Sequence, residues 1–393
     1  MKRSMAAVVV VLTVGCTGSV GQSAAKSPSL TARPSSIPSP NYTAAPTLSP
    51  TPSQGADLPV SAVNFSCRLP VVRSTQGGDS ATFDGGFVTL PSATLQPDPT
   101  SQIRSRYTEG DFVTDRAPVL YGIPQVGPPF YDASQHRWIP AAAAQSSPDG
   151  GSYAYATVGA SSSEPAHIHV VNVGTGTEKV FNVAVPAVGA PNGVVVADFD
   201  GSGVFFLVSQ VESYSSGVWR LDVATGGVKP LAQVTAVMKL HGGSAWLGRT
   251  DPHDPSPPSV PASRRLYDSI VAVNLTTGVE TPWYYRPGHS VVLRGFDTVG
   301  HPIVSVSFEP DYPVDTSEIR LIDAPGTGGE SNGEIVYTGG PWLSEPQADG
   351  DRLWFGSDRG IYLYTQATGL QKVFGFKVVG SAPEAMLPAG FCR

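Results

Sequence analysis

The chain has 393 residues, enough for two average domains or for one large all-β ring, so its length alone selects no fold. Only 15% of the residues are charged, the formal net charge is −7, and no Lys/Arg cluster is long enough to neutralise a row of phosphates, so we expect no nucleic-acid partner. No apolar run reaches the roughly 18 to 20 residues that cross a bilayer.

The N-terminal segment, MKRSMAAVVVVLTVGCTGS, has the layout of a secretory signal. Two basic residues precede about ten apolar ones, Met5–Val14, and small residues surround Cys16. The end of this segment resembles the lipobox of bacterial lipoproteins, in which the cysteine is lipidated, although Thr13 stands where an aliphatic residue is usual. We therefore expect residues 1–16 to be a lipoprotein signal with lipidation at Cys16. An ordinary cleaved signal peptide is the alternative.

Residues 17–63 are rich in Ser, Pro, Thr and Ala and carry few charges. Such a composition buries too little apolar surface to offset the entropy of ordering, so it predicts a tether. A lipid at one end and a folded domain, residues 64–393, at the other predict an extracytoplasmic protein anchored to the bacterial cell membrane. Membrane contact would run only through the lipid.

Cys67 and Cys392 bracket the predicted domain. Once Cys16 is assigned to lipid, they are the remaining pair. In an oxidising extracytoplasmic space such a pair suggests a disulfide. Two unpaired buried thiols are the alternative.

A strand–turn–strand phrase recurs along the domain, as HIHVVNVGTGTEKVF, GVWRLDVATGGVKPL, SIVAVNLTTGVETPW and GIYLYTQATGLQKVF. The turn glycines recur every 43 to 52 residues, at Gly176, Gly226, Gly278, Gly326 and Gly369. A second set of turn glycines has a similar period, at Gly150, Gly201, Gly243, Gly300 and Gly350. A period of about 40 to 50 residues with four strands per unit is typical of β-propeller blades.

One repeat predicts all four strands of a blade. Strand A is expected at residues 193–200, strand B at 203–210, strand C at 217–223 and strand D at 227–232. Five such units can be written, beginning with strand A at about Trp138 and ending at Phe376. The fold class expected is therefore all-β.

The remaining blade must come from residues 64–136, whose expected strands are 86–91, 117–122 and 129–132, with help from the other end of the chain. Sharing one blade between both chain ends closes a propeller and leaves no open sheet edge. The Cys67–Cys392 pair lies where those ends should meet. We expect six blades, or seven if residues 64–136 hold more strands than their pattern indicates.

The stretch SPDGGSYAYATV (147–158), followed by AHIHVVNVGTGT (166–177), resembles the WD-like repeats of TolB-type propellers. In those repeats Ser-Pro-Asp-Gly opens a strand, and Asp or Asn precedes Thr-Gly. Other units keep only part of the pattern: Thr365, for example, stands at the acidic or amide position. The resemblance implies a fold and no substrate, because this fold serves enzymes, receptors and scaffolds alike.

Strand connectivity predicts two different faces. In an up-and-down blade the A–B and C–D turns emerge on one face, and the B–C and D–A loops on the other. The short glycine turns belong to the first set, and long connections such as 250–268 belong to the second. Because long loops on a rigid scaffold often carry function, we expect a ligand on the long-loop face near the channel mouth. The candidates, aromatic and charged as suits protein, peptide or glycan recognition, are Tyr214, Asp251, His253, Arg264, Arg265, Tyr285, His289, Tyr312 and Trp342.

Three features could hold a cation. The stretch Asp251–Asp254 has three potential ligands but no regular spacing, and His167 and His169 share one side of a strand. The stretch Asp198–Gly203 is similar to calcium loops but has Ser209 where an EF-hand needs Glu. Loop, packing and hairpin roles explain all three, so we expect no metal or cofactor. Calcium or another divalent cation is the alternative.

No Gly-x-Ser-x-Gly, His-Glu-x-x-His or Walker-type motif occurs, and no catalytic residue is predicted. We expect a binding or scaffold module for an envelope protein, peptide or glycan. One alternative is a lactonase-like hydrolase or lyase with a divalent metal at the channel mouth, whose ligands would come from separate blades and form no local motif. Another is an envelope assembly factor of the TolB kind. Whether the chain is an enzyme stays open.

Overall fold

The computed structural model describes residues 57–77, 80–101, 128–157, 166–183, 193–209, 215–250, 267–307, 318–326, 332–339, 343–377 and 384–393. Residues 52–393 form one unit. Within the described ranges, no helix has both the length and the apolar character needed to span a bilayer. The expected strand at 117–122 and the lipobox lie outside these ranges.

Seven sheets are built from the described strands, and every strand pair is antiparallel. Blade 1 contains β25 (Glu384–Pro388), β1 (Cys67–Gly77), β2 (Ser80–Leu90) and β3 (Thr94–Pro97). Blade 2 contains β6 (Ser152–Thr157), β7 (Ala166–Asn172) and β8 (Glu178–Val183). Blade 3 contains β9 (Gly193–Asp200), β10 (Gly203–Ser209), β11 (Ser215–Leu221) and β12 (Val228–Thr235).

Three further four-stranded blades follow in chain order. Blade 4 contains β13 (Val237–His241), β14 (Ser244–Arg249), β15 (Ser269–Asn274) and β16 (Glu280–Tyr285). Blade 5 contains β17 (Ser290–Phe296), β18 (Pro302–Ser307), β19 (Glu318–Leu321) and β20 (Glu334–Thr338). Blade 6 contains β21 (Gln347–Asp349), β22 (Arg352–Gly356), β23 (Gly360–Thr365) and β24 (Gly369–Gly375). The seventh sheet is a hairpin of β4 (Phe130–Asp132) and β5 (Arg137–Ile139).

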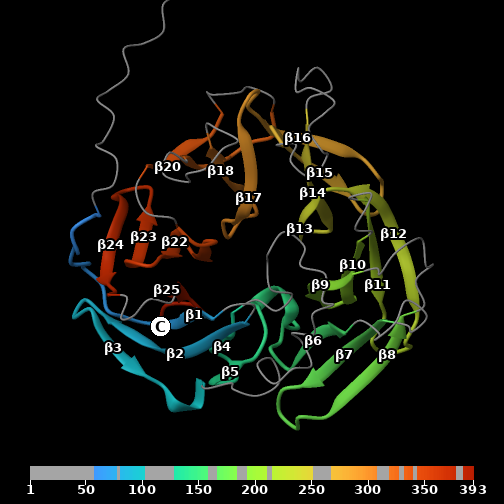
Figure 1. The fold of residues 1–393 in the computed structure, drawn as a ribbon, viewed down its shortest axis with the longest axis horizontal. Helices are drawn as coiled ribbons and strands as arrows, with labels where there is room; N and C mark the ends of the chain where they lie inside the picture. The colour runs from blue at the N-terminus through green and yellow to red at the C-terminus, as the bar shows by residue number, and fades with distance from the viewer. Residues whose placement is uncertain are drawn as a thin grey trace, which may run out of the picture. The chain divides into compact units, whose positions relative to one another are not determined.

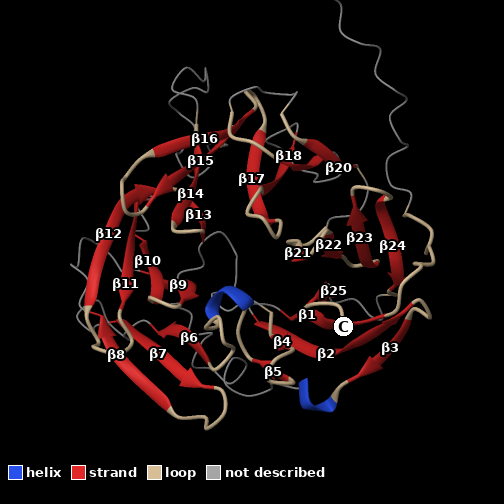
Figure 2. Cartoon of the chain, turned by 180° about the vertical axis from the view of Figure 1, so that it is seen from behind, coloured by secondary structure: helices blue, strands red, loops and turns tan. Residues whose placement is uncertain are grey.

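Apolar side chains on both faces of each sheet join it to its two neighbours. In blade 6, Leu353 and Phe355 pack toward blade 5, while Trp354 packs toward blade 1. Comparable apolar clusters join blades 2 and 3, blades 3 and 4, and blades 4 and 5. The hairpin packs between blade 1 and blade 2. The interfaces therefore follow one another around a closed ring (Figures 1 and 2), which confirms the predicted propeller.

Blade 1 closes the ring with strands from both ends of the domain, as expected. Strand β25 pairs with β1 from Val71↔Pro388 to Thr75↔Glu384. The Cys67–Cys392 disulfide reinforces this closure, with the Cα atoms 5.4 Å apart and a sequence separation of 325 residues.

The recurring turns have a shared physical basis. The side-chain oxygen of Asp222 accepts hydrogen bonds from the backbone N–H groups of Ala224 and Thr225, each at 2.9 Å. Gly226 follows with φ +73°, a left-handed conformation that glycine adopts without steric cost. Asn172 and Asn274 organise the same turn in blades 2 and 4. A short polar side chain and a glycine thus determine each tight C–D turn.

Two expectations about local structure were wrong, and one strand was not predicted. Trp138 is not on the inner strand of blade 2: it lies in β5, where its ring packs against Phe87 and its indole N–H donates to Asp98 at 3.1 Å. The inner position of blade 2 is marked by a bridge between Ser146 and Tyr153. Gly326 is not in a tight turn, because the connection it belongs to extends from β19 to β20 across residues 322–333. β1, an 11-residue strand, was not predicted at all.

Candidate functional site

The two longest B–C connections leave the ring at blades 4 and 5, where residues 250–268 join β14 to β15 and residues 308–317 join β18 to β19. Elsewhere on the expected long-loop face some connections are short. Ala236 alone links β12 to β13 and adopts φ +57°, and residues 357–359 link β22 to β23. Among the B–C connections, those of blades 4 and 5 are therefore the longest, while on the same face the D–A connection from β3 to β4 spans residues 98–129.

The roots of these loops meet at buried charged residues. Asp268 precedes β15, Arg286 follows β16, and Glu318 opens β19; they are 5%, 6% and 8% exposed. The backbone N–H of Arg286 donates to the backbone carbonyl of Asp268 at 2.7 Å, which links two loop roots of blade 4. A side-chain ion pair then links Arg286 to blade 5.

Glu318 is the centre of this cluster. Its Oε2 accepts hydrogen bonds from Arg286 Nη1 at 2.7 Å and from Arg320 Nε at 2.8 Å. Arg320 Nη1 also lies 3.5 Å from the backbone carbonyl of Asn332, whose side-chain amide donates to the carbonyl of Trp283 at 2.9 Å. We call Tyr284, Arg286, Glu318 and Arg320 the ionic cluster. It joins the end of β16 to the start of β19.

Burial gives the ionic cluster its electrostatic character. Burial opposes ionisation of Glu318, but hydrogen bonds from Arg320 and Arg286 outweigh it and hold the pKa of that carboxyl below its usual range. Burial also raises the pKa of the Tyr284 phenol, although the two arginines oppose this shift. Removing one partner from such a pair is strongly destabilising because it leaves a buried charge uncompensated. The cluster therefore holds the loop roots in one arrangement.

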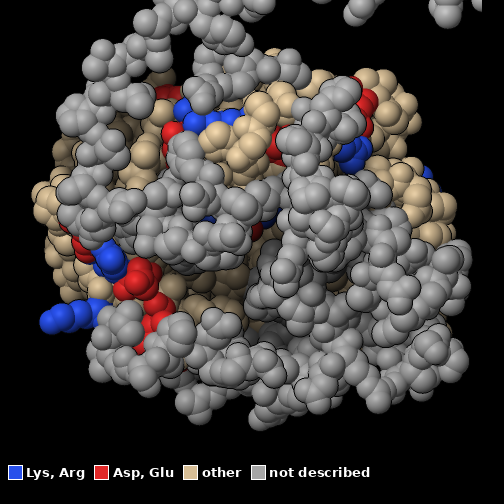
Figure 3. Space-filling model, turned by 45° about the horizontal axis from the view of Figure 1, so that its top comes forward, with Lys and Arg blue, Asp and Glu red and all other residues tan. Residues whose placement is uncertain are grey.

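Further charged side chains lie on the inner strands. Lys239 of β13 pairs with Glu345, which precedes β21, at 2.7 Å between Nζ and Oε2. This contact joins blades 4 and 6. On the inner strand of the intervening blade, Arg294 Nε donates to Ser305 Oγ at 3.1 Å. In the part of the surface visible in Figure 3, basic and acidic side chains lie beside one another.

Two of the nine predicted long-loop residues are within the described ranges. Tyr285 ends β16, next to the ionic cluster, and is partly exposed. His289 lies in the same D–A loop, with its Nδ1 2.9 Å from the carbonyl oxygen of Pro287. The other candidates, Tyr214, Asp251, His253, Arg264, Arg265, Tyr312 and Trp342, lie outside the described residues. The ionic cluster was missed, because a buried charge on a strand end has no signature in local sequence.

The histidine pair makes contacts within its own sheet. His169 Nε2 lies 2.8 Å from Thr157 Oγ1, and His169 Nδ1 lies 3.1 Å from Glu178 Oε1. His167 Nδ1 lies 2.9 Å from Asn182 Oδ1. These polar contacts across blade 2 account for both rings without a metal.

The predicted calcium-like stretch forms the A–B hairpin of blade 3. Asp200 Oδ1 accepts from the backbone N–H of Ser202 at 2.6 Å, as expected of a turn. Among the residues that the structure describes, no group of three or more His, Cys, Asp or Glu side chains could hold a metal ion. The Asp251–Asp254 stretch lies outside them.

No protein-family model matches the chain, and no curated protein matches it. Among solved structures it is similar to TolB from Acinetobacter baumannii, at 12% identity and TM-score 0.39, over 83% of this chain and 65% of that one. It is also similar to an oligogalacturonate lyase in complex with manganese, at 14% identity and TM-score 0.41, over 62% of this chain and 75% of that one. An acylaminoacyl peptidase from Pyrococcus horikoshii matches at 12% identity and TM-score 0.39, over 78% of this chain and 46% of that one.

These similarities concern the fold alone. The chain spans 35% of the length of a similar prolyl endopeptidase, 65% of TolB and 46% of the acylaminoacyl peptidase. The strand order and the closing blade define this chain as a β-propeller protein.

Proposed function

We propose that this chain is an extracytoplasmic propeller, anchored through lipid at Cys16, that binds a protein, peptide or glycan of the cell envelope. Its binding surface is the long-loop face in the sector of blades 4 and 5. The ionic cluster carries this proposal, because it holds the roots of the two longest B–C connections and of the D–A loop with Tyr285 and His289. A buried charge cluster is a costly way to stabilise a strand end, and it suits loops that must keep one geometry.

Partly exposed aromatic residues at these roots fit such a role. Tyr285 and His289 present rings next to a rigid base, and aromatic side chains dominate the binding energy of many protein and glycan interfaces. The predicted loop residues Arg264, Arg265, Tyr312 and Trp342 would extend the same surface. No cofactor is needed for this function.

The test uses the full chain with the paired change Tyr285→Ala and His289→Ala. Binding is measured against defined peptide and glycan arrays and confirmed by titration with the best probe. The matched control is Val279→Ala with Val299→Ala, because these valines are 60% and 73% exposed and lie in C–D and A–B turns of the opposite face. We expect the first pair to weaken binding at least about tenfold and the control to leave it unchanged.

Equal weakening of binding by both pairs of substitutions would show that the long-loop face is not the binding surface. If the chain turns over lactone, ester or polyuronate substrates and a chelator stops this turnover, the protein is a metal-dependent hydrolase or lyase and the binding proposal is wrong. Assay of the same chain with and without a chelator distinguishes these outcomes.

A further inference from the structure

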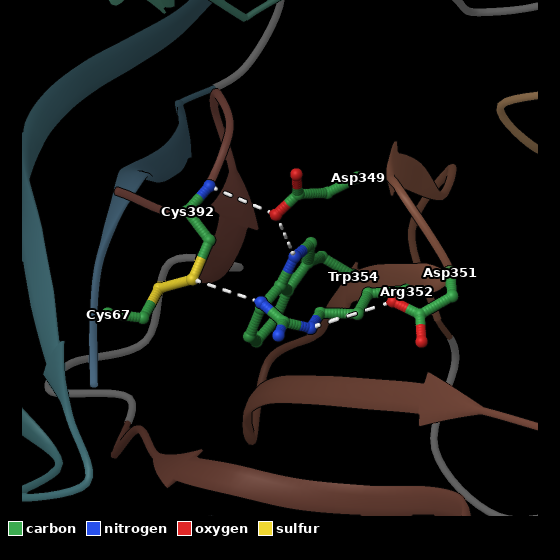
Figure 4. The surroundings of a disulfide bond; sticks show 6 residues. All are labelled: Cys67, Asp349, Asp351, Arg352, Trp354 and Cys392. Carbon is green, nitrogen blue, oxygen red and sulfur yellow. Dashed lines mark hydrogen bonds and ion pairs between the residues drawn. A yellow bond between two sulfur atoms is a disulfide. The ribbon is translucent and has the colours of Figure 1, made fainter. Parts of the chain in front are cut away.

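The two sulfur atoms of the ring-closing disulfide have different surroundings. Cys67 is 3% exposed and belongs to the apolar cluster between blades 6 and 1, together with Leu69, Val88 and Leu363. Cys392 is partly exposed, and its Sγ lies 3.8 Å from Nη1 of Arg352 (Figure 4). Cys67 is therefore buried, whereas Cys392, which also packs against this cluster, is partly exposed and contacts a cation.

Arg352 is held in place from two sides. Its guanidinium carbon lies 4.0 Å from the ring centroid of Phe65. Its Nε lies 3.9 Å from Oδ1 of Asp351, whose side chain is 91% exposed. Because that carboxylate is solvated and distant, it neutralises little of the positive charge at the sulfur.

The other charged groups near Cys392 contact its backbone or its neighbour. Asp349 Oδ2 accepts from the backbone N–H of Cys392 at 3.1 Å and from the indole N–H of Trp354 at 3.2 Å, so its charge is engaged by two donors (Figure 4). Arg393 Nη1 lies 3.4 Å from Nδ1 of His136. The backbone N–H of Arg68 donates to the carbonyl of Arg393. Among the described residues, Arg352 is the charged group that contacts the sulfur itself.

Thiol–disulfide exchange proceeds through a thiolate. A nearby cation and access to solvent favour the thiolate, and apolar burial disfavours it. In the folded chain before oxidation, Cys392 therefore meets both requirements, whereas Cys67 is buried and has no direct contact with the cation in the described structure.

We propose that Cys392 is the entry cysteine for oxidation of this propeller by a disulfide-bearing thiol oxidoreductase, and that Cys67 is the resolving cysteine. In the first step the Cys392 thiolate attacks one sulfur of the oxidant disulfide, a mixed disulfide forms, and the other oxidant sulfur leaves as a thiolate. In the second step Cys67 loses its proton to solvent and attacks Sγ of Cys392, and the remaining oxidant sulfur leaves. The two cysteines are oxidised, and one oxidant disulfide is reduced to two thiols.

The fold places Cys67 next to Cys392 for the second step, the attack of Cys67 on the mixed disulfide. Pairing of β25 with β1 brings the Cys67 and Cys392 Cα atoms to 5.4 Å, and the N–H of Ala389 donates to the carbonyl of Pro70 at 2.9 Å. Resolution is then intramolecular between groups already side by side. The inference depends on the fold and not on the proposed binding function.

The experiment compares Cys67→Ser with Cys392→Ser in the full chain. Each remaining thiol is alkylated with iodoacetamide in short pulses across neutral and alkaline pH, and labelling is located by peptide mass, so Cys16 does not interfere. We expect Cys392 to react at least about tenfold faster than Cys67 in the folded state, and both to react alike in urea. Oxidised glutathione should form a mixed disulfide at Cys392 and not at Cys67.

Arg352 provides the matched control, in the Cys67→Ser background. Arg352→Gln should move the pH midpoint of Cys392 alkylation upward, and Arg352→Lys should restore most of the shift. A merely structural role for Arg352 would leave this midpoint unchanged. Equal alkylation rates for the two cysteines in the folded state would overturn the proposal, and so would an unchanged pH midpoint in Arg352→Gln. Equal rates count against it even where loss of one cysteine frays the ring.

Discussion

Leu58 and Phe65 pack against opposite faces of blade 6. Leu58 joins the apolar cluster between blades 5 and 6, whereas Phe65 joins the cluster between blades 6 and 1, where its ring centroid lies 6.4 Å from that of Trp354. Between them, Val60 pairs with Lys372 of the outer strand β24. Residues 57–66, which we call the strap, therefore cross the outer edge of blade 6. A covered edge is protected from pairing with other chains.

The strap begins with an ionic contact that predicts a pH-dependent contribution to stability. Asp57 pairs with Lys372, and its Oδ1 accepts from the Tyr362 hydroxyl at 2.7 Å. Burial opposes ionisation, but these two partners outweigh it and hold the pKa of Asp57 below its usual 3.8. Asp57→Asn should lower the free energy of unfolding by about 1 kcal/mol at neutral pH.

This difference should vanish in acid. A carboxyl whose pKa is depressed in the folded state contributes stability above its unfolded pKa, and the contribution is lost as pH falls through the folded value. Urea titrations at neutral pH and in strong acid measure the difference in unfolding free energy between Asp57→Asn and the unchanged protein. Asp358→Asn is the control, because Asp358 is an exposed aspartate of the same blade. A difference that persists unchanged in acid would contradict the assignment.

Glu318→Gln should destabilise the protein by about 3 kcal/mol, because two buried arginines lose the carboxylate that they share. Glu345→Gln is the matched control: its side chain is 59% exposed in the pair with Lys239, so its loss should lower stability by less than about 1 kcal/mol. Chemical denaturation of both variants measures the contrast. Similar effects for the two would mean that the ionic cluster does not hold blades 4 and 5 together.

For Asp198 we expect a pH dependence of stability opposite to that of Asp57. Burial raises its pKa from 3.8 to about 6, and repulsion from Asp200 adds to this. Between those values the folded state binds more protons than the unfolded state, so the ionised carboxylate increasingly destabilises the fold as pH rises through this window. Asp198→Asn should stabilise the protein by about 1 to 2 kcal/mol at pH above about 7 and by nothing below about 4. Thermal melting at both pH values tests this, and a gain in acid would disprove it.

Replacement of both ring-closing cysteines by serine should lower the free energy of unfolding by roughly 3 to 5 kcal/mol, since the unfolded chain loses the constraint on a very long loop. The β-sheet signal should survive, because five residue pairs of β1 and β25 still close blade 1. Far-ultraviolet circular dichroism and urea titration measure both effects. Loss of folded structure in mild conditions would show that the strand pairing cannot close the ring alone.

Much of the architecture could be predicted where neighbours in the chain determine structure. Strand A of blade 3 was expected at 193–200, and β9 is Gly193–Asp200. Turns built by Asn172, Asp222 and Asn274 were recognisable because their hydrogen bonds reach only a few residues ahead. Residues 57–63 of the strap were assigned to the tether, since their composition carries no sign of the apolar surface that receives Leu58.

The sequence by itself determined the repeat, the tight turns and the closure of the ring, because hydrophobic alternation and turn chemistry act over short distances and the cysteines mark both ends. Only the tertiary structure decided which charges meet. Arg286 and Glu318 come from different blades, and their contact depends on how two twisted sheets pack. The same holds for Arg352 beside Cys392: the packing of blade 6 against blade 1 buries Cys67 and leaves Cys392 partly exposed.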